Sequence, residues 1–170
     1  DMRLEVIQKI VSDCIPENSY YSEWNHDKLK NEVEVNLNIN IPAKDWINED
    51  GIVENEIIER IEKESSHFMA KKISKIGNDI FRDAEKSILL QVLDQCWKDH
   101  LLYLDQLRQS IGLRAYGQKD PLNEYKKEAF QLFEMMLSKI SFMITSILAK
   151  VEIGEEKTLD KSSSNKKKDN

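Results

Sequence analysis

Glycine, proline and cysteine are all scarce in this sequence. Its 170 residues contain five glycines and three prolines, whereas an average usage of about 7 % would give roughly a dozen glycines. So few turn-forming residues among so many Glu, Lys, Leu and Ile favour long helices, and we expect an all-α fold. The two cysteines, Cys14 and Cys96, form no CxxC pair and have no neighbouring histidine in a ligand spacing. We therefore expect a reduced, intracellular compartment and no metal site.

Long apolar runs and an excess of positive charge are also missing. The longest apolar run, residues 140–149, is about half of the ~20 residues that a membrane-spanning helix needs, so neither a span nor a signal peptide is expected. The 25 basic and 31 acidic residues leave a net charge of −6, which does not favour a nucleic-acid partner. The chain opens on Asp1 with a helical pattern already under way, so we expect it to be a piece of a longer protein.

The first third of the chain contains helical patterns separated by breaks. Residues 2–14 place apolar side chains on one helical face, and Pro16 ends this helix because the residue before a proline is excluded from the α region. A shorter helix is expected over residues 26–35. The segment 37–51 predicts a brief extended stretch followed by a turn.

A charged helical pattern then runs from Val53 to about residue 76, and Gly77 predicts a break. At the other end of the chain, residues 154–170 contain a single apolar side chain, and we expect this tail to be disordered because it cannot offset its own ordering entropy. Its three consecutive lysines, at 166–168, fall short of the four to eight cations that indicate lipid binding.

The strongest pattern consists of two apolar repeats of nearly thirty residues each, over 80–111 and 121–151. Apolar side chains recur every three or four residues in both, and Asp120 and Pro121 suit the N-cap and first position of the second helix. A short link between them predicts an antiparallel helical hairpin with arms of ~40 Å. The residues expected to pack the hairpin are Leu93, Trp97, Leu101, Leu104, Phe133 and Ile140.

The hairpin also has more large apolar side chains than one seam can cover. Those off the main stripe are Leu90, Leu102, Tyr103, Phe130, Leu132 and Phe142. An isolated pair of helices buries too little surface to be stable. A second surface must therefore pack on another element, either within this chain or in a partner.

The link between the two long helices nearly spells a phosphate-binding loop. In GxxxxGK[ST] the lysine follows the second glycine directly, but here Gln118 separates Gly117 from Lys119. No Ser or Thr follows to hold Mg²⁺, and the loop joins two helices where a phosphate loop joins a strand to a helix. We reject a nucleotide site at this loop.

Other candidate chemistry is equally weak. Glu64 and His67 have the spacing of a di-iron carboxylate–histidine pair, but His100 has Trp97 where the second pair needs a glutamate, so a solvent-exposed face is the better interpretation. His100 is expected to cap or hydrogen-bond beside the seam. We expect no catalytic residues, and no enzyme active site, within these 170 residues.

Residues 89–137 contain two long patterns, LDxxWKxHL and LRQxIxLRxYxQKDPxxEYK. This stretch resembles the C-terminal region of SecA, the family of ATP-driven motors of the bacterial preprotein translocase. Upstream, PAKDWI at 42–47 and the charged helix after it resemble the helical wing domain of that family. The resemblance covers residues 1 to about 153.

The resemblance implies a division of the chain into four parts. Residues 1–14 are similar to the end of a long scaffold helix, 15–78 to the helical wing domain, and 79–153 to the two-helix finger of the scaffold. The tail, 154–170, contains no cysteine, unlike the zinc-binding end of many family members.

In the family, the tip of the finger reaches the cytoplasmic mouth of the SecYEG channel and contacts the unfolded preprotein. This implies a contact tip made of Gly112, Arg114, Tyr116, Gly117 and Lys119, in which the two glycines allow left-handed or tight conformations. The finger also lies against the nucleotide-binding domains and regulates ATP hydrolysis.

ATP and Mg²⁺ are the expected cofactors of the parent motor, and none is expected in this part of it. A second SecA copy and anionic lipid are candidate partners, and the cytoplasm and the cytoplasmic face of the inner membrane are the expected location. The alternative is a free-standing helical adaptor that binds partner helices through its spare apolar face.

Overall fold

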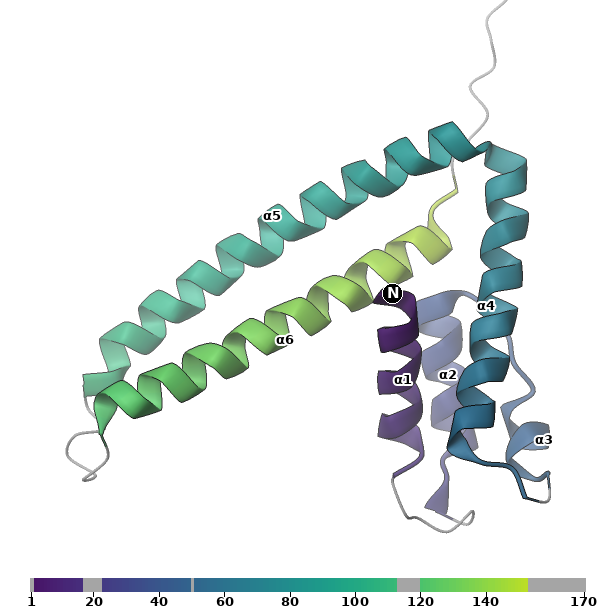
Figure 1. The fold of residues 1–170 in the computed structure, drawn as a ribbon, viewed down its shortest axis with the longest axis horizontal. Helices are drawn as coiled ribbons and strands as arrows, with labels where there is room; N and C mark the ends of the chain where they lie inside the picture. Colours follow the sequence, from purple (N-terminus) through teal and green to yellow (C-terminus); the bar gives the residue numbers. More distant parts are fainter. Residues whose placement is uncertain (1, 17–22, 50, 113–119, 153–170) are drawn as a thin grey trace, which may run out of the picture.

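The computed structural model describes residues 2–16, 23–49, 51–112 and 120–152, and every regular element among them is an α-helix (Figure 1). The all-α expectation is therefore confirmed. In chain order the helices are α1 (Met2–Cys14), α2 (His26–Leu37), α3 (Ala43–Ile47), α4 (Glu54–Ile76), α5 (Asn78–Ser110) and α6 (Pro121–Lys150).

The helix ends follow from local chemistry. The side chain of Asn25 caps α2 by accepting a hydrogen bond of 2.9 Å from the backbone N–H of Lys28. At the other end of α2, Asn38 is left-handed with a φ of 55°, a conformation that asparagine tolerates better than most residues. Gly77 separates α4 from α5 with a φ of 94°, so the predicted break is confirmed and needs a glycine.

The expectation for 37–51 is met only in part, because Gly51 lies in a turn but the helix α3 was not expected. Leu37, Ile39 and Ile41 alternate with exposed residues and are buried, but the described residues around them offer no strand to pair with. The backbone instead leaves α2 and enters the five-residue helix α3. The alternation therefore reflects apolar side chains that enter the core from an irregular segment.

Helices α1 to α4 share one hydrophobic core. Its fully buried members include Ile7 of α1, Val33 of α2 and Ile57 of α4. We call this assembly the wing bundle. Although α1 was expected to belong with the scaffold, its apolar face packs in the same cluster as the wing helices.

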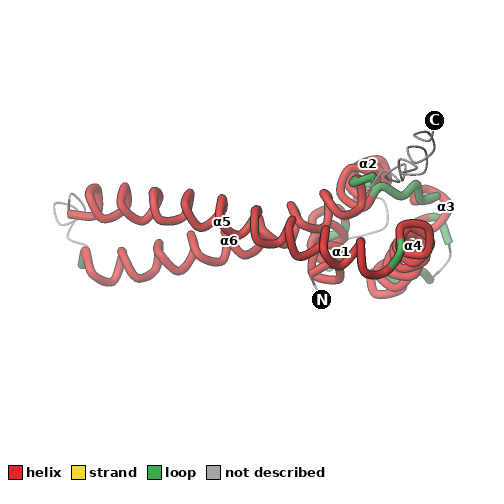
Figure 2. The backbone as a smooth tube through the Cα atoms, turned by 90° about the horizontal axis from the view of Figure 1, so that it is seen from above, coloured by secondary structure: helices red, strands yellow, loops and turns green. Residues whose placement is uncertain are grey.

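Helices α5 and α6 form a long hairpin that projects from the wing bundle (Figures 1 and 2). They enclose a second hydrophobic cluster, which also receives Met69, Ile73 and Ile76 from the end of α4. The C-terminal half of α6 contributes to this cluster and also packs on α1 and α2. The hairpin is therefore anchored to the wing bundle mainly through α6.

The expectation that no segment crosses a membrane stays a prediction. Helix α6 is the one described helix that is long and apolar enough to span a bilayer by length and composition. Core helices of soluble proteins pass the same test, and α6 packs against α5, α1 and α2.

A charged cluster ties α4 to the turn after α3. The Arg60 guanidinium donates two parallel hydrogen bonds to Glu49, of 2.7 and 2.6 Å, and a third of 2.7 Å to Glu56. It also lies 5.7 Å from the centroid of the Trp46 ring. The hydrogen bonds from Arg60 lower the pKa of the Glu49 carboxyl.

We predict that Arg60→Gln raises the pKa of Glu49 toward its ordinary value, measured by a ¹³C NMR titration of the carboxyl groups. Because the pKa of Glu49 is lower in the folded chain than in the unfolded one, its contribution to stability is present above the unfolded pKa. That contribution is lost as the pH falls through the folded pKa, and Arg60→Gln removes this part of the pH dependence. Lys63→Gln, an exposed change on the same helix, is the control, and an unchanged Glu49 titration in Arg60→Gln would contradict the assignment.

Candidate functional site

The candidate site is the free end of the α5–α6 hairpin together with the exposed sides of its two helices. Four of the five predicted tip residues, Arg114, Tyr116, Gly117 and Lys119, lie outside the described residues, so their role stays a prediction. The two ends of the link are described. Helix α5 ends at Ser110, and α6 begins at Pro121.

Gly112 lies at the described edge of the tip. Its φ is outside the left-handed region, and a Cβ added to it would meet no atom within 4 Å. Gly112 therefore does not use the left-handed conformation, and the expectation that it allows a tight conformation at the tip stays a prediction.

The start of α6 is built as the sequence predicts. The Asp120 carboxylate accepts hydrogen bonds of 3.1 Å from the backbone N–H of Leu122 and 2.6 Å from the Asn123 amide. Pro121 occupies the first turn, where its missing N–H costs nothing. The cap at Asp120 holds the C-terminal end of the tip to a regular helix.

The seam of the hairpin is rotated from the predicted one. Leu93, Trp97 and Leu101, expected to pack the hairpin, are 42 %, 45 % and 50 % exposed. The buried positions of α5 around the seam are Val92, Cys96, His100 and Leu107. Most of these lie one residue before the predicted stripe, a rotation of ~100° about the helix axis.

The remaining predicted seam residues divide in the same way. Ile140 of α6 is buried in the hairpin cluster. Leu104 is half-buried, and Phe133 is 38 % exposed. Tertiary packing therefore selected one of two apolar stripes on α5.

The displaced residues form an exposed apolar surface that we call the outer face. It consists of Leu90, Leu93, Trp97 and Leu101 of α5 and Phe130, Phe133 and Leu137 of α6. Within each helix these positions share one side by their spacing of three and four. His100 joins the two helices, with ring centroids 5.7 Å from Trp97 and 5.9 Å from Phe133. A group of exposed apolar side chains of this kind is a candidate interaction site.

Polar contacts hold the base of α6 to the wing bundle. The Ser141 hydroxyl donates to the Glu5 carboxylate at 3.3 Å, and the Asn38 amide donates to the carbonyl of Ala149 at 3.3 Å. Lys72 of α4 donates to the carbonyls of Leu148 and Ala149 at 2.8 and 2.9 Å. A cation at this point satisfies terminal carbonyls and complements the helix dipole. The sequence analysis missed this contact because Lys72 reads as one of several lysines on a charged helix.

The same burial that places Lys72 against α6 lowers the pKa of its ammonium group. A nearby carboxylate, Glu152, acts in the opposite direction. The carbonyl oxygens of Leu148 and Ala149 replace the water that the buried ammonium group has lost, and this stabilises its charged form at the end of α6.

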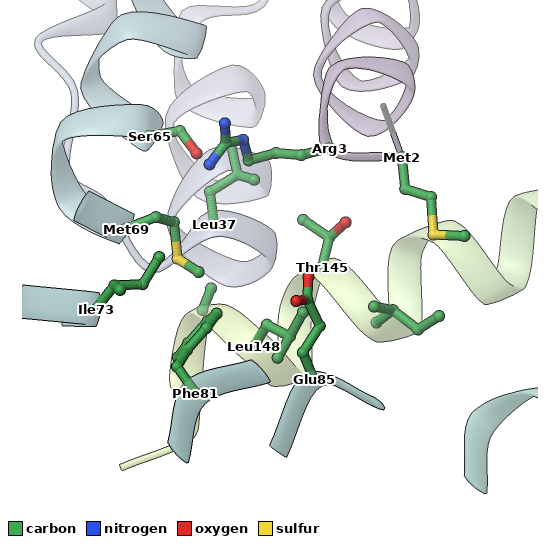
Figure 3. Close-up of a pocket in the computed structure, with 12 residues that line it drawn as sticks. Met2, Arg3, Leu37, Ser65, Met69, Ile73, Phe81, Glu85, Thr145 and Leu148 are labelled. Atoms are coloured by element: carbon green, nitrogen blue, oxygen red, sulfur yellow. The ribbon is translucent and has the colours of Figure 1, made fainter. Parts of the chain in front are cut away.

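A hollow of about 340 Å³ lies at the base of the hairpin, between its two helices and the wing bundle (Figure 3). Its wall is mostly apolar, with Phe81 of α5, Leu148 of α6 and Met69 of α4 (Figure 3). Arg3, which donates to the Ser66 hydroxyl at 3.0 Å, and Glu85 are its charged lining residues. This lining offers no nucleophile paired with a base.

The structure also places the other residues that the sequence offered for chemistry, the Glu64–His67 pair and His100. Glu64 and His67 are both exposed on α4, as the sequence analysis expected. His100 is buried, but its Nδ1 has no hydrogen-bond partner among the described residues, which differs from the expected cap or hydrogen bond. Across the described ranges, no group of three or more His, Cys, Asp or Glu side chains is placed to hold a metal ion.

A family model and the curated relatives that match this chain all name the same family. The family model described as the SecA wing and scaffold domain matches residues 1–152. The chain is 48 % identical over 154 residues to the protein translocase subunit SecA of Granulibacter bethesdensis, which covers 91 % of this chain and 17 % of that protein. It is 47 % identical over 156 residues to the subunit of Acidiphilium cryptum, covering 92 % and 17 %. The chain thus spans about a sixth of the length of the curated relatives it matches.

Proposed function

Because the chain belongs to the SecA wing and scaffold domain family, we propose that it is the wing and two-helix finger of a motor for bacterial protein export. In this proposal the wing bundle is the base, and the α5–α6 hairpin is the lever that reaches the translocating polypeptide. The single observation that supports it best is the hairpin itself, which projects from the bundle with helices of 33 and 30 residues.

The tip is proposed as the polypeptide contact. Tyr116 has a flat, amphipathic ring that can lie against many different side chains without selecting a sequence. Arg114 and Lys119 add positive charge, which suits acidic loops at the channel mouth. The cap at Asp120 and the end of α5 at Ser110 leave only a short link at the tip, so a contact there transmits force to two regular helices.

The outer face is proposed as the surface that meets the nucleotide-binding domains. Its seven large apolar side chains are exposed in this chain, and a surface of this size needs a cover. Packing of motor domains on Trp97 and its neighbours would couple the position of the finger to ATP hydrolysis. ATP and Mg²⁺ belong to those domains in this proposal.

The proposed partners are the SecYEG channel, the unfolded preprotein and the other domains of the same motor. The proposed location is the cytoplasm and the cytoplasmic face of the inner membrane, where the channel mouth opens. A second motor subunit and anionic lipid are further candidate partners.

We predict that Tyr116→Ala in the full-length motor slows preprotein transport about 5- to 30-fold, the effect of losing a contact of ~1–2 kcal/mol. Nucleotide binding should be unchanged, because the tip is far along the hairpin from its base. The measurement is preprotein uptake into membrane vesicles, with nucleotide affinity measured in parallel.

Tyr103→Ala is the matched control, because Tyr103 is an exposed tyrosine on the shaft of the same hairpin. It should transport preprotein at close to the normal rate. Normal transport by Tyr116→Ala would contradict the assignment of Tyr116 as the polypeptide contact. It would favour a helical adaptor that acts through the outer face.

A further inference from the structure

Two sulfur atoms from different helices meet in the seam of the hairpin. The Sγ atom of Cys96 on α5 lies 3.9 Å from the Sδ atom of Met143 on α6. Cys96 is almost fully buried, and Met143 packs against the same cluster. The proposed export function uses neither residue.

A nitrogen donor lies one helical turn from Cys96. His100 is four residues further along α5, so both side chains project from the same face of the helix. The expectation that neither cysteine has a histidine in a ligand spacing is therefore wrong for Cys96. His100 is only 5 % exposed, and its buried Nδ1 lacks a hydrogen-bond partner among the described residues. A buried polar atom without a partner is costly and requires an explanation.

The donor set selects a class of ion. Thiolate and thioether sulfurs prefer soft cations such as Cu(I), and imidazole accepts copper as well. Two donors bound at ~2.3 Å and separated by 120° would lie about 4.0 Å apart, and the two sulfurs lie 3.9 Å apart. Harder ions are disfavoured, because among the described residues no three His, Cys, Asp or Glu side chains converge.

An access route is also present. A surface hollow of about 360 Å³ on the flank of the hairpin is lined by Cys96, His100 and Met136. The ion pair between Lys139 and Asp99, at 3.2 Å, belongs to the same wall. A small cation can therefore approach Cys96 and His100 from the side, without separation of the helices, and meets Met143 through its contact with Cys96.

We propose that Cys96, Met143 and the His100 imidazole form a site for one soft monovalent cation, Cu(I) or Ag(I). On binding, the Cys96 thiol releases its proton to water and the thiolate bonds to the cation. The lost proton and the bound cation carry the same charge, so the net charge of the site does not change. Because the ligands come from α5 and α6, the cation cross-links the two arms of the hairpin and stiffens it. The sequence pattern could not reveal this site, since Met143 is 47 residues from Cys96.

The test is a titration of the chain with Ag(I) in a chloride-free buffer, in a Cys14→Ser background that removes the other buried thiol. Methionine ε-methyl groups are labelled with ¹³C. We expect one equivalent to bind, one proton to be released and the Met143 methyl resonance to move, while those of Met2 and Met69 stay in place. Met143→Leu, a volume-conserving change, should weaken Ag(I) binding at least ~10-fold in competition with glutathione, the loss of ~1.4 kcal/mol.

Three outcomes would overturn the proposal. A Met143 resonance that does not move, or a Met143→Leu variant that binds Ag(I) as tightly as its parent, would mean binding by the thiol alone. One equivalent bound after Cys96→Ser would place the ion elsewhere. The melting temperature of each variant without Ag(I) shows whether it is folded, and the methyl resonance in the unsubstituted site tests the proposal even where a variant does not fold.

Discussion

Ile57→Asp is expected to unfold the wing bundle, with a loss of about 4 kcal/mol or more in the free energy of unfolding. Ile57 is 0 % exposed and lies in the core shared by α1 to α4. A carboxylate there would lose its water without a partner, and the protonated form would still leave polar atoms in an apolar cluster. The measurement is chemical denaturation followed by circular dichroism.

Val53→Asp, one turn earlier, provides a matched control with an effect of opposite sign. Val53 occupies the N-cap of α4 in an extended conformation, is 55 % exposed and makes no side-chain cap hydrogen bond. Aspartate at an N-cap accepts a hydrogen bond from the first turn, so the variant should gain about 1 kcal/mol. If both aspartates destabilise the chain equally, the burial assigned to Ile57 is wrong.

Ile140→Ala is expected to lower the free energy of unfolding by about 3 kcal/mol, because it removes buried methyl and methylene groups and leaves a cavity. Ile140 is buried in the hairpin seam, whereas Leu137, three residues earlier on α6, is 48 % exposed on the outer face. Leu137→Ala should therefore cost only about 1 kcal/mol, since it removes less buried area.

The comparison between these two alanine variants tests the rotation of the seam directly. Equal losses would mean that the outer face is covered in solution and that the seam and the outer face contribute alike. In the full-length motor, the outer face is proposed to meet the nucleotide-binding domains. There Leu137→Ala should change the rate of ATP hydrolysis, although it lowers the free energy of unfolding by only about 1 kcal/mol.

Local patterns predicted the helices well because their causes are local. The break at Gly77 and the cap at Asp120 depend on backbone conformations and hydrogen bonds within a few residues. The helix α3 within 37–51 was missed, because five residues are too few to show a helical period.

The site was harder to predict, because its geometry depends on pairs of residues far apart in the chain. Lys72 reaches the carbonyls of Leu148 and Ala149 across 76 and 77 positions, and Cys96 meets Met143 across 47. Neither contact has a spacing signature. The motif around Tyr116 could be read directly because it is contiguous, although most of it lies outside the described residues.

The sequence by itself determined the helical class, the ends of several helices and the family to which the chain belongs. Only the tertiary structure decided which side of each helix is buried. Helix α5 has apolar residues both at Val92 and Cys96 and at Leu93 and Trp97, and a 3.6-residue period fits either stripe. The choice between them is made by the side chains of α6 that fill the space between the helices, because close packing admits one rotation and leaves the other stripe exposed.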